Sequence, residues 1–177
     1  MSKIYANKVA DLYCTIKNPA GKYIEIGDVT SFTIPDVSFA DGEVSGAGIL
    51  GTVNIPDIFS IEAMEAAVTT KSFSDGVLAA INPEGVNIRH NWAVDNISGN
   101  NNGSYTSYTA TIKGRPKNIP GGDTKKGEAM ELTTNIACSY YKLSMNGRVI
   151  HEIDPLNGKL IIDGTDYAKK LNIALNK

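Results

Sequence analysis

A glycine pattern is the first feature of the sequence that could carry chemistry. Gly46-Ala-Gly-Ile-Leu-Gly51 matches the G-x-G-x-x-G spacing of a dinucleotide-binding loop. Such a loop needs a buried strand before it and a helix after it, because the helix N-terminus receives the pyrophosphate. Here an acidic stretch precedes the glycines, Pro56 blocks an early helix, and Lys71 stands near the position where an acid would hold the ribose. The pattern therefore favours a flexible or tightly packed hairpin over a nucleotide site.

Histidine and cysteine are the other candidates for chemistry. His151-Glu152-x-Asp154 could be read as metal ligands, but two further ligands at suitable spacing are absent from the sequence. Cys14 and Cys138 are too few for a disulfide framework, and each lies in an apolar run where a thiol is usually a small core residue. No G-x-S-x-G or Cys/His motif occurs. The sequence predicts no enzyme, no cofactor and no metal.

Length and composition limit the remaining classes of protein. The chain has 177 residues and 18.9 kDa, which fits one domain. Its 42% hydrophobic residues allow a core, and its net charge of -2 argues against a strongly basic nucleic-acid binder. No apolar run approaches the ~20 residues that span a bilayer, and the N-terminal residues lack an apolar signal core. We therefore expect a soluble protein that is made in the cytoplasm and is not inserted in a membrane.

The charges are unevenly placed along the chain. Residues 23–70 contain no Lys or Arg and eight acids, namely Glu25, Asp28, Asp36, Asp41, Glu43, Asp57, Glu62 and Glu65. Five bases cluster later, in or beside one predicted loop: Lys113, Arg115, Lys117, Lys125 and Lys126. Opposite charges on two regions of one chain can attract copies to each other. The alternative is a solvated surface with chance clustering.

Short strand-like runs with turn residues between them dominate the sequence. The longest run is Leu132 to Met145, and Asn146-Gly147 after it is a type I′ hairpin signal. Residues 100–103 read as a loop. This pattern predicts a mainly antiparallel sandwich or barrel and not a parallel α/β sheet.

Three segments have helical character. Ser74 is a predicted N-cap for a helix from Asp75 to about Ile81, and Thr165 for a helix from Asp166 to about Leu175. The composition of Ile61 to Val68 also favours a helix.

The last third of the chain contains a distinctive segment. It reads Ser139-Tyr-Tyr-Lys-Leu-Ser-Met-Asn-Gly-Arg-Val-Ile-His-Glu-Ile-Asp-Pro-Leu-Asn-Gly158 and is followed by Ile162-Asp-Gly-Thr-Asp166. This segment resembles the closing part of the major tail tube protein of contractile-tailed phages and R-type bacteriocins. Upstream, Lys113-Gly-Arg-Pro-Lys-Asn-Ile119 and Lys126-Gly-Glu128 are similar to a basic stretch of that family, with the first base shifted. The similarity is weaker before residue 60.

The resemblance implies a fold and an assembly. The fold would be two packed antiparallel sheets in a small barrel-like sandwich, with a flanking short helix and a C-terminal helix. Residues 1–177 would form a single domain, and residues 61–70 would be a strand, against their composition. Subunits would form hexameric rings that stack into a tube inside a contractile sheath, with baseplate and tail terminator proteins as further partners. The virion tail would be assembled in the host cytoplasm, and its tube would conduct DNA or puncture an envelope.

A long hairpin at about residues 36–53 would cross between subunits. Its expected contact residues are Asp36, Asp41, Gly42, Glu43, Gly46, Gly48 and Gly51. The five clustered bases would form an inter-subunit loop, and part of the acidic block would line the lumen, where it would repel DNA phosphates. Two alternatives stay open: a tube subunit of a non-viral injection system or bacteriocin, and a monomeric β-sandwich binding module.

Overall fold

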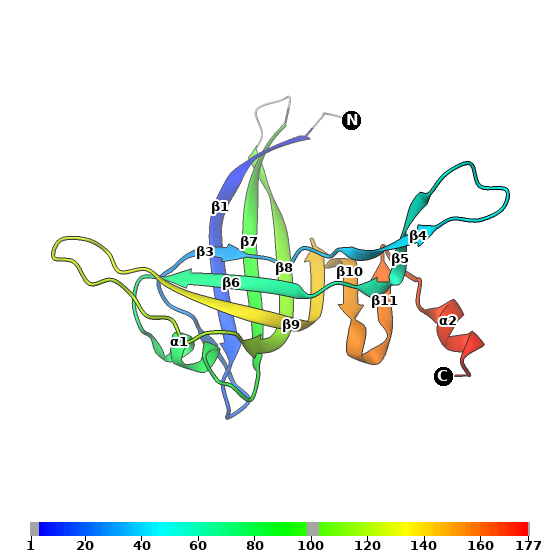
Figure 1. Ribbon diagram of the computed structural model, residues 1–177. Coiled ribbons are helices and arrows are strands. Elements are labelled where there is room, and N and C mark those ends of the chain that lie inside the picture. The colour runs from blue at the N-terminus through cyan, green and yellow to red at the C-terminus, as the bar shows by residue number, and fades with distance from the viewer. Residues whose placement is uncertain (1–3, 99–102, 177) are drawn as a thin grey trace.

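The chain folds mainly into antiparallel strands. The computed structural model describes residues 4–98 and 103–176 (Figure 1). Its elements, in chain order, are β1 (Ile4–Lys17), β2 (Tyr23–Glu25), β3 (Val29–Thr33), β4 (Phe39–Val44), β5 (Val53–Ile61), β6 (Met64–Thr70), α1 (Asp75–Ala80), β7 (Val86–Ser98), β8 (Gly103–Pro116), β9 (Leu132–Met145), β10 (Arg148–Asp154), the 3-10 turn η1 (Pro155–Asn157), β11 (Lys159–Ile162), β12 (Thr165–Asp166) and α2 (Lys169–Ala174). The loop predicted at residues 100–103 lies outside the described residues except for Gly103.

Strand β9 joins two layers of sheet. One layer has the strand order β12-β11-β10-β9-β8-β7-β1-β2, and the other consists of β3, β6 and the first half of β9. Residues 132–138 of β9 pair with β6, whereas residues 136–145 pair with β8. In Figure 1, β3 and β6 run across β1, β7 and β8. The prediction of two packed antiparallel sheets is confirmed.

The core lies between these two layers. Ile16, Ile88 and Ile112 are fully buried on β1, β7 and β8. They belong to one cluster with Val68 of β6 and Ile136 of β9. Alternate residues of a strand point to opposite faces, so each strand gives one apolar row to this cluster.

Residues 61–70 form strands and no helix, which makes the expectation from composition wrong. β6 buries every second residue, at Met64, Ala66, Val68 and Thr70. It hydrogen-bonds with β3 on one side and with β9 on the other. Burial on a two-residue period between two partner strands outweighs the weak helix propensity of alanine and glutamate.

One of the two predicted helix starts is confirmed. The Ser74 side chain accepts a hydrogen bond from the N–H of Val77, and α1 begins at Asp75. The second prediction is wrong, because Thr165 and Asp166 pair with β11 as strand β12. α2 therefore begins only at Lys169 and has no side-chain cap.

A row of stacked aromatic rings crosses the layers at His90. The His90 ring lies 4.3 Å from that of Phe32 and 5.0 Å from that of Trp92, measured between ring centres. Tyr108 continues the row, 5.2 Å beyond Trp92. His90 is only 4% exposed, and its Nδ1 has no hydrogen-bond partner. Burial lowers the pKa of His90 to about 4, so the ring is neutral at pH 7.

The Asn146-Gly147 turn has the predicted geometry. Both residues have positive φ, 49° at Asn146 and 81° at Gly147, as a type I′ turn requires. The Asn146 side chain also accepts hydrogen bonds from the backbone N–H and the hydroxyl of Ser107. The turn therefore also ties the β9–β10 hairpin to β8, a role that the sequence did not predict.

Substitution Gly147→Val is expected to destabilise the protein by about 1–3 kcal/mol. No atom lies within 4 Å of a Cβ built at this position, so the loss comes from the left-handed backbone alone. Thermal unfolding of the monomer measures it. The matched control is Gly121→Val, because Gly121 also has open space but no positive φ. Equal melting temperatures for the two variants would contradict the prediction.

Candidate subunit interface

The β4–β5 hairpin is a separate two-stranded ladder outside the main sheet. Its pairing runs from Phe39↔Ile61 to Val44↔Val53. The hairpin is thus longer than the predicted residues 36–53, because all of β5 takes part. Figure 1 shows it projecting from the side of the molecule that carries β11 and α2.

Seven large apolar residues of the hairpin are exposed. Leu50 is fully exposed at its tip. The other exposed large apolar residues of the hairpin are Val44, Ile49, Val53, Ile55, Ile58 and Phe59. So many exposed apolar side chains on one element make the hairpin a candidate interaction surface.

The glycines of the hairpin shape its loop and do not form a nucleotide site. Gly48 and Gly51 have φ of 92° and 106°, and no helix follows, since the chain enters β5 at Val53. A Cβ at Gly42 would lie 2.9 Å from the carbonyl oxygen of Ile55, so β4 and β5 approach closely there. Among the predicted acids, Asp36, Asp41 and Glu43 are all exposed. Asp36 precedes β4, and the other two lie within it.

The five predicted bases divide into two groups. Lys113 and Arg115 lie on β8, and Lys117 follows it directly. Lys125 and Lys126 lie in the long loop between β8 and β9, which projects on the far side from the hairpin in Figure 1. Lys117, Lys125 and Lys126 therefore lie in the segment between β8 and β9, whereas Lys113 and Arg115 are strand residues.

Two of these bases form ion pairs within the chain. Lys117 Nζ lies 2.7 Å from Glu65 Oε2, which uses one acid of the residue 23–70 block. Lys125 Nζ lies 3.7 Å from Glu128 Oε2. Lys113 Nζ instead lies 4.7 Å from the centre of the Tyr140 ring. Part of the charge complementarity seen in the sequence is therefore satisfied inside one chain.

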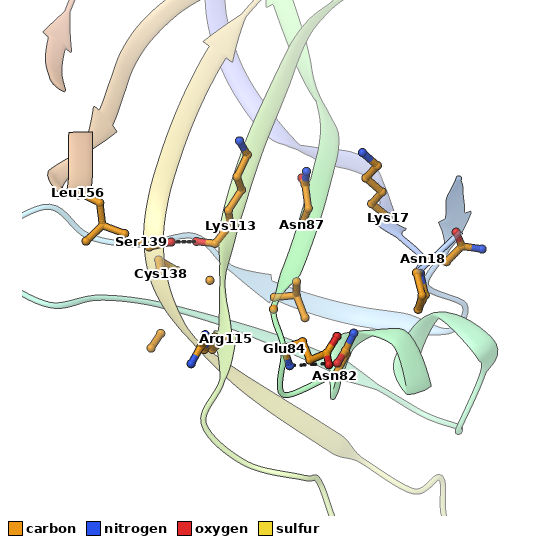
Figure 2. A pocket seen from close by; sticks show the side chains of 15 residues that line it. Lys17, Asn18, Asn82, Glu84, Asn87, Lys113, Arg115, Cys138, Ser139 and Leu156 are labelled. Carbon is orange, nitrogen blue, oxygen red and sulfur yellow. Dashed lines mark hydrogen bonds between the residues drawn. The ribbon is translucent and has the colours of Figure 1, made fainter. Parts of the chain in front are cut away.

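An open cleft of about 780 Å³ lies beside the first group of bases (Figure 2). Lys17, Lys113 and Arg115 line it with one acid, Glu84. Burial raises the pKa of the Cys138 thiol to about 11, so this thiol is protonated and a poor nucleophile near neutral pH. The Ser139 hydroxyl donates to the carbonyl of Lys113. The walls thus offer positive charge and no activated nucleophile.

The acids that follow His151 have structural partners. Glu152 Oε1 accepts hydrogen bonds from Lys159 Nζ at 2.8 Å and from the Tyr140 hydroxyl at 3.1 Å. The Asp154 carboxylate caps η1 by accepting from the N–H of Asn157. Within residues 4–98 and 103–176, no group of three or more His, Cys, Asp or Glu side chains is placed to hold a metal ion. Over the same ranges, no helix has the length and apolar character to cross a membrane.

Comparison with known proteins identifies the family. Residues 21–175 match the family model described as phage tail tube protein FII. The chain belongs to this family. It is similar to the tail tube protein of Escherichia phage P2, at 26% identity over 144 residues, which is 79% of this chain and 82% of that protein. It is also similar to the major tail tube protein of Serratia phage KSP20, at 26% identity over 132 residues, which is 75% of each chain.

A solved structure shows a more distant likeness. A chain in the cryo-EM structure of the anti-feeding prophage baseplate, 6-fold symmetrised, aligns with a TM-score of 0.47 and 9% identity. The alignment covers 81% of this chain and 97% of that chain.

The chain is therefore a tail tube subunit and a component of a virion tail, where it assembles with other tail components. The resemblance found in its last third is confirmed. Two features of the tail tube subunit were missed in the sequence. The exposed apolar residues of β5 lie beyond the predicted hairpin boundary, although the β-forming run from Val53 to Ile61 was a usable signal. The surface between β5 and α2 joins segments so far apart in the chain that no local pattern indicates it.

Proposed function

We propose that this tail tube subunit forms hexameric rings that stack into the hollow inner tube of a contractile tail. The observation that carries the proposal is the β4–β5 hairpin, whose apolar residues are exposed while it shares no ladder with the main sheet. A hairpin of two strands is at best marginally stable alone. Contact with a neighbouring copy would bury its apolar side chains and fix its position.

The sheet edges support the same assembly. β2 and β12 end the strand order of one layer, and β3 ends the other. Exposed strand edges invite pairing with another chain, and closure of strands into a ring removes them. Neighbouring copies in a ring would join their sheets in this way around the lumen. The whole chain, residues 1–177, would act as one domain in this assembly.

The tube would have a mechanical role and no catalytic one. Its lumen would conduct DNA or its tip would puncture an envelope, and part of the acidic residue 23–70 block would line the lumen. A negative wall repels phosphates and so prevents DNA from binding during passage. Sheath, baseplate and tail terminator proteins would be the partners, and assembly would take place in the host cytoplasm. A bacteriocin or a non-viral injection system would use the same subunit.

Electron microscopy of the purified full-length protein in negative stain tests the proposal. We expect rings with six-fold symmetry and hollow tubes built from them. Light scattering over a range of protein concentrations accompanies the images. A protein that stays monomeric at every concentration would contradict the proposal and favour the β-sandwich binding module.

The loop bases Lys125 and Lys126 are expected to promote contact with acids of another copy. Reversing both to Glu should slow polymerisation, and more strongly at low salt than at high salt, because salt screens exposed charges. Each exposed pair is worth only about 0–1 kcal/mol, but the contact repeats around every ring. Light scattering during assembly measures the rate.

The matched control reverses two exposed lysines on other turns, Lys22 and Lys71, and makes the same change in net charge. A rate that falls equally in both double variants would mean that net charge alone acts. A rate that changes in neither would make the loop a solvated surface.

A further inference from the structure

Four bases lie together on the solvent-facing side of the main sheet, on four neighbouring strands. They are Lys17 of β1, Arg89 of β7, Lys113 of β8 and Lys142 of β9. Each directly follows a fully buried residue, and these residues are Ile16, Ile88, Ile112 and Tyr141. Because successive side chains of a strand point to opposite faces, the four bases share the face that the core does not use. We call it the basic face.

The strand register places these bases in a zigzag. Arg89 and Lys142 share one row across the strands, because each pairs with Thr111. Lys113 lies two residues beyond Thr111 and therefore in the next row. Lys17 lies in that row too, two residues beyond Thr15, which pairs with Arg89. Figure 2 shows the side chains of Lys17 and Lys113 pointing the same way. Each base is thus a diagonal neighbour of the next, roughly 7–8 Å away.

Tyrosine rings hold two of the bases in position. Arg89 Cζ lies 4.8 Å from the centre of the Tyr23 ring, and Lys113 Nζ lies 4.7 Å from that of Tyr140. The Tyr140 hydroxyl in turn donates a hydrogen bond to Glu152. Within residues 4–98 and 103–176, none of the four bases forms an ion pair. Their charges are therefore positioned but not neutralised.

The charges around the basic face limit what can bind there. Neighbouring like charges destabilise a sheet, so an anion placed between the bases would relieve their repulsion. Glu25 of β2 and Glu152 of β10 flank the row of Arg89 and Lys142 on its two sides. Glu84 lines the adjoining cleft of Figure 2. A long polyanion would meet these acids, whereas a folded protein can place carboxylates against the bases and its own bases against the acids.

The polar character of the basic face separates it from the apolar hairpin. Thr15, Asn87 and Thr111 pair with its bases and lie between them. Permanent interfaces between subunits are more apolar than interfaces between proteins that also exist separately. A separately folded component of the tail therefore fits this face better than a second copy of the chain.

We propose that the basic face docks a carboxylate-bearing surface of a different tail component. The inference goes beyond the proposed tube function and rests on it only for the origin of the partner. Arg89 would bind a carboxylate through two guanidinium nitrogens, because its planar group matches the two carboxylate oxygens. The three lysines would add point charges around that contact.

Fluorescence anisotropy with a labelled glutamate-rich peptide tests the basic face. We expect the full-length protein to bind the peptide, and more weakly as salt is added. Arg89→Gln with Lys113→Gln should weaken binding by up to roughly thirtyfold, since each exposed charge pair is worth up to about fivefold. The control is Lys169→Gln with Lys170→Gln, which removes two exposed bases of α2. If loss of the tyrosine contacts unfolds the first variant, Lys17→Gln with Lys142→Gln makes the same change in charge.

Sedimentation of assembled tubes with the same peptide shows whether the basic face stays open between copies. We expect the peptide in the pellet. If no tubes form but the monomer binds the peptide through Arg89 and Lys113, the tube function fails and the docking face stands.

Four outcomes would overturn the proposal. The monomer may bind no peptide even at low salt, which would make the face a solvated surface, or the control variant may lose as much affinity. Binding by the monomer but not by tubes would mean that copies of the chain cover the face. Tighter binding of a labelled oligothymidine of equal charge would mean a phosphate site.

Discussion

Removing the outer half of the β4–β5 hairpin is expected to abolish tube formation and to leave the subunit folded. The change deletes residues 43–54 and joins Gly42 to Ile55 through an Asn-Gly turn, because these two residues are directly paired in the ladder. The ten strands of the main sheet and its buried cluster are untouched. Electron microscopy measures assembly, and thermal unfolding of the monomer measures the fold.

A milder variant tests whether the apolar tip of the hairpin, and not only the length of its ladder, is needed for assembly. Ile49→Ser with Leu50→Ser keeps the ladder and its length but removes the exposed aliphatic groups. We expect this pair of substitutions to weaken assembly strongly, with an unchanged melting temperature of the monomer.

Normal tubes from the deletion variant would show that the hairpin is no interface. A large drop in melting temperature would show instead that the hairpin stabilises the subunit itself.

Acid is expected to destabilise the subunit through His90. The neutral ring is stacked and buried in the folded state, where its pKa is about 4 instead of the 6.5 that is usual for histidine. Between these two values the unfolded chain binds a proton that the folded chain does not. Stability is therefore full above pH 6.5 and falls as the pH drops toward 4, by about 3 kcal/mol.

Chemical denaturation from pH 7.5 to 4 measures this loss. The control is His90→Phe, which keeps an aromatic ring between Phe32 and Trp92 but cannot titrate. Burial also lowers the pKa of His151, so the control should keep a smaller loss of the same sign. If both proteins lose the same stability over this range, His90 is not the group that responds to acid.

Sequence reasoning succeeded where the structure is set by residues close together in the chain. The Asn146-Gly147 turn depends on two neighbouring φ angles, and the Ser74 cap depends on an N–H three residues away. Both are local and were predicted. The family was also recognised from the sequence, because the residues that resemble it near the end of the chain follow one another almost without a gap.

The predictions failed where distant segments decide the structure. Residues 61–68 have helix-forming composition, but most of them belong to strand β6, since β3 and β9 provide partners on both sides. Thr165 was expected to cap a helix, but it pairs with Ile162 of β11 as part of strand β12. The surface between β5 and α2 is built from β5, η1, β11 and α2, so no single stretch of sequence encodes it. Its residues were found only in the structure.

The sharing of β9 between both layers has a consequence for the order of folding. Thr70 pairs with Leu132, and Met64 pairs with Cys138. β6 can therefore pair with β9 only after that much later part of the chain has been synthesised. The same strand completes the other layer by pairing with β8. Long-range pairing of this kind slows folding to roughly milliseconds to seconds. Both layers are therefore completed at the same late stage of folding. A nascent chain that ends before β9 has no closed core to bury the apolar side chains of its strands.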